Sequence, residues 1–342
     1  MQLCMIWMAA TMLLSRHGTT AMLPTQSVLI LGANGRFGRV ARRAFAEAGW
    51  AVIAQARRAL LDECNPRVRH LALEATQTKA IVDAAGDAAV VVNALNPIYT
   101  QWEAEALALN ESAVTVARDL GATLMLPGNV YNYGYSMPII VTDRTPERPS
   151  TRKGEIRCQM EARMRAACTR SIVVRAGDFF GGPGTGTWMD QVIMKDIRRV
   201  RITYPGPRDV LHAWAYLPDL ARSFVALAQI REELSFHTTV LFPGYALTGT
   251  QLVVAITDAA RQLGVLEGAL KPRVRTLPWR AIGLARFFNP MMREIWRMRY
   301  LWQVSHRLSG DGLEQIIGKV PSTSLGEALS ASLATVLAIE TR

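Results

Sequence analysis

The stretch SVLILGANGRFG, residues 27–38, decides the fold of this 342-residue chain. An apolar, strand-like run at 27–31 leads directly into three glycines at 32, 35 and 38, and a helical pattern follows from Val40 to Ala48. In such a turn the first glycine permits the bend, the second lets the backbone approach a pyrophosphate, and the third lets helix and strand pack closely. The free N–H groups at the helix start favour phosphate. The stretch therefore predicts a dinucleotide-binding turn, with a plain strand–helix turn as the alternative, and the predicted cofactor-binding residues in it are Gly32, Asn34, Gly35, Arg36, Phe37 and Gly38.

Apolar strand patterns and amphipathic helix patterns alternate from this stretch as far as Arg175, which predicts a Rossmann-type doubly wound parallel sheet of the α/β class. A glycine-rich segment at 177–186 breaks the alternation, and a mostly helical tail follows from about residue 245. We therefore expect a Rossmann domain at 25–178, to which 209–243 return. The segments 179–208 and 244–342 are expected to form a smaller, mostly helical C-terminal substrate lobe.

Composition narrows the class of protein. Half of the residues are hydrophobic, which excludes a disordered chain. The net charge is +11, but the arginines are scattered, so an anionic small molecule fits them better than nucleic acid. Four widely spaced cysteines predict neither a metal site nor a disulfide framework and favour the cytoplasm. Residues 1–24 are expected to be an apolar extension outside the fold, and no membrane partner is expected.

The end of the second predicted strand indicates which cofactor is bound. An acidic residue there would bind an adenosine ribose, whereas arginine meets a 2′-phosphate. The sequence has no carboxylate at this point, and Arg57 and Arg58 follow the strand. Forked hydrogen bonds from two arginines suit a phosphate dianion, so NADP is predicted over NAD. A solvated loop is the alternative for this pair.

Taken in order, several segments resemble the extended short-chain dehydrogenase/reductase superfamily, specifically its NAD-dependent epimerase/dehydratase family. The resemblance covers about residues 28–247. Beyond the glycine turn, it rests on four segments that match the family's landmarks: Val92–Pro97, Pro127–Gly134, Arg175–Gly181 and Tyr216–Ala221. It implies that Asn93 and Ala94 line the cofactor.

The family's Tyr-x-x-x-Lys pair is replaced here. Alignment of the following helix places Lys153 at the tyrosine position and Arg157 at the lysine position, with Asn129 near the family's serine. Arg157 could hold ribose hydroxyls but is not a ready proton donor. Lys153 could transfer a proton if its pKa were depressed. The alternative is that Lys153, Arg157 and Glu161 form a solvated helix stripe with i, i+4 spacing.

Other candidate site residues lie outside this helix. Tyr131 and Tyr133 flank the site and could replace the missing tyrosine, although wall or core positions suit them better. Asp178 lies on a loop that faces substrate in the family, and His212 is better explained as a structural histidine. Arginine mixed with aromatics at Pro290–Trp302 is typical of a membrane or nucleic-acid surface, but a core-and-lid helix is the favoured interpretation.

These observations predict an NAD(P)-dependent oxidoreductase or epimerase-like enzyme that acts on a carbonyl or secondary alcohol. The resemblance implies a sugar nucleotide as substrate. The alternative is a non-catalytic NADP-binding sensor or scaffold, because the Tyr-x-x-x-Lys pair is missing. A small-molecule substrate is the expected partner, and a homodimer is left open.

Overall fold

The computed structural model describes residues 26–61 and 64–340, so the predicted extension at 1–24 lies outside the described residues. A seven-stranded parallel sheet forms its centre, in the order β11–β7–β5–β4–β1–β2–β3. β1 lies between β2 and β4, so the strand order reverses there. In doubly wound sheets ligands bind beside such a reversal, at the carboxyl ends of the strands. This confirms the predicted doubly wound sheet. The strands are β1 Ser27–Leu31, β2 Ala51–Gln55, β3 Val68–Leu71, β4 Val90–Asn93, β5 Thr123–Asn129, β7 Ser171–Ala176 and β11 His237–Leu241.

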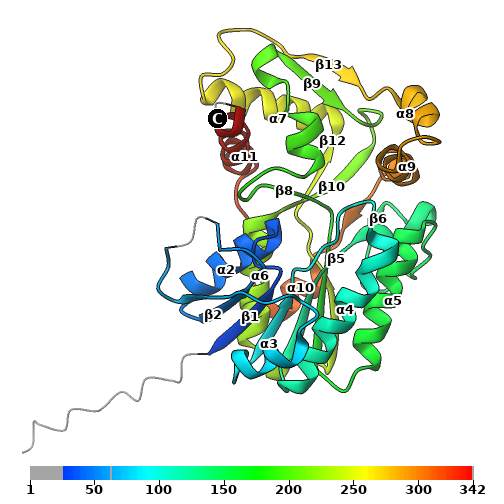
Figure 1. Cartoon of the computed structure of the whole chain (residues 1–342). Coiled ribbons are helices and arrows are strands. Elements are labelled where there is room, and N and C mark those ends of the chain that lie inside the picture. Colours follow the sequence, from blue (N-terminus) through cyan, green and yellow to red (C-terminus); the bar gives the residue numbers. More distant parts are fainter. Residues whose placement is uncertain (1–25, 62–63, 341–342) are drawn as a thin grey trace, which may run out of the picture.

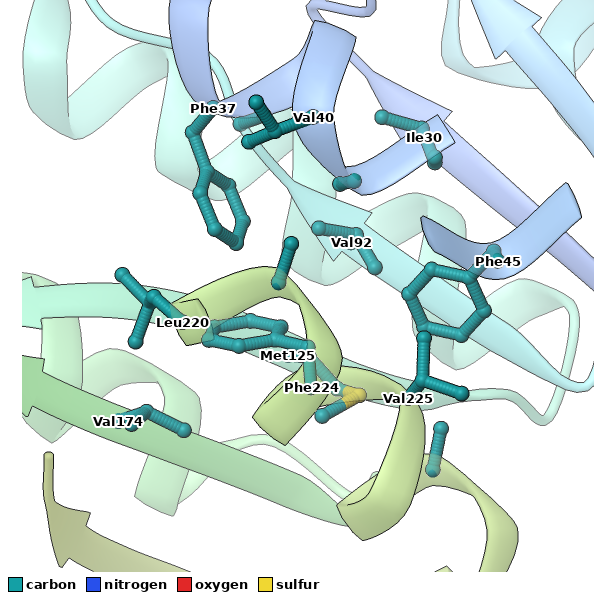
Figure 2. Packing of buried hydrophobic residues seen from close by; sticks show 14 of the residues in the cluster. Ile30, Phe37, Val40, Phe45, Val92, Met125, Val174, Leu220, Phe224 and Val225 are labelled. Carbon is teal, nitrogen blue, oxygen red and sulfur yellow. The ribbon is translucent and has the colours of Figure 1, made fainter. Parts of the chain in front are cut away.

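Helices cover both faces of this sheet, which is why each inner strand has a run of apolar, buried residues. In Figure 2, Phe37 from one helix and Phe224 from another meet over Val92 and Val174 of the strands; their ring centroids are 4.8 Å apart. One face carries α2 Arg36–Glu47, α6 Leu217–Gln229 and α10 Asp311–Ile317. The other face carries α3 Thr78–Ala85, α4 Trp102–Asp119 and α5 Arg152–Ala166.

A second lobe lies over the carboxyl ends of the strands (Figure 1). Its core gathers around large aromatic residues, including Trp214 and Trp302, both buried. Its strands are β8 Asp178–Phe180, β10 Leu211–Tyr216 and β12 Tyr245–Thr248 in one sheet, and β9 Arg201–Tyr204 with β13 Arg273–Thr276 in another. Its helices are α7 Gly249–Gln262, α8 Trp279–Ala285, α9 Pro290–Arg297 and α11 Leu325–Glu340. The remaining elements of the described residues are short: the strands β6 Ile140–Val141 and β14 Arg307–Leu308, and the short helices η1 Val130–Ser136, η2 Met189–Ile193, η3 Ile197–Arg199, η4 Arg231–Glu233 and η5 Met298–Trp302.

Two features bear on the predicted domain boundaries. Strand β10, within the segment 209–243, pairs with β8 and β12 and not with the strands of the central sheet. Helix α10 lies within the predicted lobe segment, yet its Leu313 is fully buried in the Rossmann core. The sequence gives no clear signal for the edge strand β3, because its four residues VRHL include two adjacent polar ones and none of them is buried.

Within the described part of the chain, no helix has both the length and the apolar character needed to cross a bilayer.

Candidate functional site

The glycine turn between β1 and α2 has a geometry that only glycine satisfies at two positions. Gly32 has a φ of +76°, and a Cβ there would lie 2.9 Å from the carbonyl oxygen of Ala94. A Cβ at Gly38 would lie 2.3 Å from the carbonyl oxygen of Gly32, so the third glycine lets α2 pack on the turn. Gly35 is the N-cap of α2 and has an ordinary φ of −65°. Its missing side chain leaves backbone open beside the first-turn N–H groups, which have no helical partners. This cradle fits a pyrophosphate.

Gln55, at the carboxyl end of β2, supports the cradle from below. Its side-chain oxygen accepts a hydrogen bond from the Gly32 N–H at 2.9 Å, and its side-chain nitrogen donates to the Leu73 carbonyl at 2.5 Å. The residue is buried. Sequence reasoning missed this role, although Gln55 is the only polar residue in the strand AVIAQ and stands at its end.

Asn34 connects the glycine turn to the loop after β2. Its side-chain nitrogen donates to the carbonyl oxygens of Arg58 and Ala59, at 3.2 and 2.9 Å, and its oxygen accepts from the Leu61 N–H at 3.2 Å. The side chains of Arg57 and Arg58 are exposed on this loop, and Arg57 lies 3.8 Å from a Glu74 carboxylate oxygen. The two arginines are therefore held next to the cradle, while binding of a 2′-phosphate by them stays a prediction.

The side chains of Arg36 and Phe37, two further residues predicted to bind the cofactor, make other contacts within the protein. The Arg36 guanidinium binds the carboxylate of Asp190 at 2.5 Å and the carbonyls of Gly181 and Gly184 at 2.8 and 2.9 Å. Burial lowers the pKa of Arg36, and Asp190 opposes that effect. The Phe37 ring is in the core. Only the backbone N–H groups of these two residues remain candidates for phosphate binding.

The segment after β4 forms the opposite wall of the cradle. Asn93 is buried; its nitrogen donates to the Asn110 side chain at 3.3 Å, and its oxygen accepts from the Leu95 N–H at 3.2 Å. These bonds tie the end of β4 to α4. Ala94 presents its carbonyl to Gly32, as described above. Cofactor contact by Asn93 and Ala94 stays a prediction.

The predicted stripe on α5 is buried, so the interpretation of a solvated helix face is wrong. Lys153, Arg157 and Glu161 have exposed fractions of 2%, 7% and 0%. The i, i+4 spacing does align them, but Trp102 and helix α9 of the second lobe cover that face. The sequence could not show this cover, because α9 is more than a hundred residues away.

Lys153 joins the two lobes. Its ammonium donates to the Tyr99 carbonyl at 2.9 Å and forms a short ion pair with Glu294 of α9. It also lies 4.3 Å from the centre of the Tyr99 ring. Burial lowers the pKa of Lys153, and the Glu294 carboxylate opposes the shift. Lys153 thus holds α9 against α5, and proton transfer by it stays a prediction.

The side chain of Arg157 extends from α5 to the end of β5. Its guanidinium carbon is 4.7 Å from the centre of the Trp102 ring, and one terminal nitrogen donates to the Pro127 carbonyl at 3.3 Å. Its Nε is buried without a hydrogen-bond partner among the described residues. A buried unpaired donor is costly, so this atom marks a place for an acceptor such as a ribose hydroxyl.

Asn129 is the last residue of β5, and Tyr131 lies two residues beyond it in η1. The Asn129 side-chain oxygen accepts from the Tyr131 N–H at 3.0 Å and caps η1. Burial raises the pKa of Tyr131, the Asp178 carboxylate adds to the rise, and the Arg157 charge opposes it. The phenol is therefore a proton donor at neutral pH rather than a base.

The buried imidazole of His212 is hydrogen-bonded to the partly buried carboxylate of Asp178. The imidazole Nε2 lies 3.0 Å from an Asp178 oxygen and Nδ1 lies 3.1 Å from the Leu301 carbonyl. The ring stacks on Trp302 at 4.4 Å. Both ring nitrogens are engaged, which agrees with a structural histidine.

A double-mutant cycle should show that Lys153 and Glu294 act as a pair. We expect Lys153→Met and Glu294→Gln each to destabilise the protein, and the double variant to be more stable than additivity predicts by roughly 1–3 kcal/mol. Chemical denaturation of the four proteins measures this coupling. Strict additivity would show that the two groups do not interact in solution.

Comparisons with known proteins agree with this geometry. The RmlD substrate binding domain family matches residues 26–202, more than half of the chain. A search of curated proteins found no match. Among solved structures, MoeE5 in complex with UDP-glucose and NAD has 16% identity and a TM-score of 0.70, over 92% of this chain and 100% of that one. UDP-glucose-4-epimerase from Stenotrophomonas maltophila, with bound NAD and formylated UDP-arabinopyranose, has 12% identity and a TM-score of 0.72, over 92% of this chain and 99% of that one.

A third similar structure is UDP-N-acetylglucosamine 4-epimerase from Methanobrevibacter ruminantium M1, with 13% identity and a TM-score of 0.69 over 93% of this chain and 100% of that one. At these identities the likeness concerns the fold. The family match over more than half of the chain shows the family directly, and the glycine cradle agrees with it. The chain belongs to the RmlD substrate binding domain family, within the extended short-chain dehydrogenase/reductases.

Proposed function

We propose that this protein is an NADP-dependent, epimerase-like oxidoreductase that acts on a carbonyl or secondary alcohol of a sugar nucleotide. One observation carries the proposal: the glycine cradle, supported by Gln55, is joined through Asn34 to the loop that bears Arg57 and Arg58. A backbone turn suited to a pyrophosphate therefore lies next to a loop with two exposed arginines, which supports the assignment. Two of the similar structures, MoeE5 and the Stenotrophomonas maltophila epimerase, contain NAD together with a UDP sugar, which supports a nicotinamide cofactor and this substrate class.

The residues present fit a nicotinamide dinucleotide along the carboxyl ends of the strands. The first-turn N–H groups of α2 would hold the pyrophosphate. Arg57 and Arg58 would hold the 2′-phosphate. Arg157, with its unpaired buried Nε, would hold the ribose next to the nicotinamide.

When bound, the cofactor supplies or accepts the hydride. In the direction of reduction, the carbonyl oxygen also needs a proton, and we assign this proton to the phenol of Tyr131, which burial keeps protonated. The positive charge of Arg157 then stabilises the phenolate that remains. Arg157 itself stays protonated and orients the partners. In this scheme Lys153 keeps the second lobe over the site through Glu294.

Calorimetric titration tests the cofactor preference. We expect NADP to bind more tightly than NAD, and Arg57→Ala with Arg58→Ala to weaken NADP binding by roughly 1–3 kcal/mol per lost charged hydrogen bond while barely changing NAD binding. Arg118→Ala removes a half-exposed arginine on α4 and serves as the matched control. Equal or tighter binding of NAD to the wild type would refute the preference.

The engaged state of Lys153 favours a second candidate, a non-catalytic NADP sensor. Its ammonium is already bound to Glu294 and the Tyr99 carbonyl. The resemblance implies that Lys153 replaces the family's tyrosine at this position. A sensor would bind NADP and gain thermal stability, but would convert none of a panel of UDP sugars, as measured by chromatography of the sugar nucleotides together with nicotinamide absorbance. Turnover that Tyr131→Phe abolishes, with NADP affinity retained, would decide for the enzyme.

A further inference from the structure

The α8–α9 hairpin presents apolar side chains to solvent at its tip. Phe287 and Phe288, in the turn between the helices, have exposed fractions of 63% and 85%, and Leu284 at the end of α8 has 68%. Large apolar side chains exposed together in this way usually mark an interaction site. In Figure 1 the two helices lie side by side at the edge of the second lobe.

This tip is an ordered structure. The N–H groups of Phe288 and Asn289 donate to the Ala285 carbonyl at 3.0 and 2.9 Å, and the Asn289 side chain caps α9 through the Met291 and Met292 N–H groups. Behind the tip, Trp296 packs against Gly283 of α8, and Arg286 lies over its ring at 4.7 Å. The phenylalanines are therefore held outward by a rigid base.

The charge around the tip is strongly one-sided. Residues 271–299 contain eight cations and one acid, Glu294, and that acid is already bound to Lys153 and Arg297. The side chains of Arg280 on α8 and Arg293 on α9 are exposed beside the apolar tip. Trp279 and Trp296 lie at the base of the hairpin, and the centroids of their rings are 6.4 Å apart.

We propose that the α8–α9 hairpin docks the protein on an anionic lipid surface, with Phe287, Phe288 and Leu284 entering the headgroup boundary. Exposed apolar residues flanked by arginines and tryptophans are the combination that binds such an interface. A second copy of the chain fits less well, because a symmetric contact would bring the two cationic patches together. Single-stranded nucleic acid fits less well too, because the aliphatic Leu284 offers no stacking surface for a base. The proposal goes beyond the proposed function and does not depend on it.

Vesicle flotation of the full chain tests the proposal. We expect the protein to float with vesicles of phosphatidylcholine and phosphatidylglycerol at low salt and much less with pure phosphatidylcholine. Phe287→Ser with Phe288→Ser should lower the partition coefficient by roughly tenfold or more. Arg280→Gln with Arg293→Gln should lower it by roughly tenfold and flatten its salt dependence.

Phe236→Ser is the matched control, because Phe236 is 50% exposed on the Rossmann domain, away from the hairpin. It should leave flotation unchanged, and all variants should keep the wild-type melting temperature. Failure to float with anionic vesicles overturns the proposal. So does a dimer, measured by light scattering, that the Phe287/Phe288 variant abolishes in the absence of lipid binding. Oligonucleotide binding by a protein that ignores vesicles would also overturn it.

Discussion

Glu161→Ala should lower the free energy of unfolding by about 3–5 kcal/mol, because it leaves the guanidinium of Arg175 underpaired in the protein interior. The Glu161 side chain is fully buried and accepts hydrogen bonds from two nitrogens of Arg175, at 3.2 and 2.5 Å. A third Arg175 nitrogen donates to the Tyr133 hydroxyl at 2.8 Å. Glu147 is the remaining acid on this arginine. Urea denaturation followed by circular dichroism measures the loss.

Two further variants separate the buried pair from general effects on the helix. Glu155→Ala removes a half-exposed glutamate from the same helix and should change stability by about 0.5 kcal/mol or less. Glu161→Leu combined with Arg175→Met removes both charges and should cost less than Glu161→Ala alone, since no buried charge is left unpaired. A loss below about 1 kcal/mol for Glu161→Ala would mean that Glu147 alone neutralises Arg175.

The sheet could be predicted because residues close together in the sequence mark each inner strand. Each of these strands contains a short apolar run, and the run at 27–31 followed by three spaced glycines is typical of the first strand and turn of a Rossmann fold. The strand β3 escaped because its residues Val68–Leu71 are only partly buried at the sheet edge. Helix α10 escaped assignment to the Rossmann core because its anchor, Leu313, packs against residues far away in the sequence.

For the candidate site, the sequence predicts the backbone positions but not the partners of the side chains, because those partners are distant in the sequence. The backbone of the glycine turn and the position of α5 follow from local pattern, and both are where the sequence placed them. The partners of the side chains are not local. Nothing near Lys153 in the sequence indicates Glu294, and nothing near Arg36 indicates Asp190. The Lys153, Arg157 and Glu161 stripe has the i, i+4 spacing of an exposed helix face and is nevertheless buried. The side chain of Arg36, predicted to bind the cofactor, is bound to the carboxylate of Asp190.

Gly38→Ala should destabilise the protein by about 3 kcal/mol and should also weaken NADP binding. A Cβ at this position would lie 2.3 Å from the Gly32 carbonyl oxygen and 2.8 Å from the Ala33 Cα. Both are backbone atoms, so no side chain can move aside, and α2 must shift away from β1. That shift would separate the first-turn N–H groups from the cradle that Gly32 and Gln55 form. Denaturation and calorimetric titration of the same protein measure the two losses.

Gly326→Ala is the matched control, because Gly326 also lies in the first turn of a helix but has no atom within 4 Å of its added Cβ. There the extra methyl group should raise stability by about 0.5–1 kcal/mol through the smaller entropy of the unfolded chain. The two glycines thus share an intrinsic helix propensity and differ in the space around them. If Gly38→Ala kept its stability but lost NADP, the third glycine would serve the cofactor directly. If it kept both, the close contact between α2 and the glycine turn would not hold in solution.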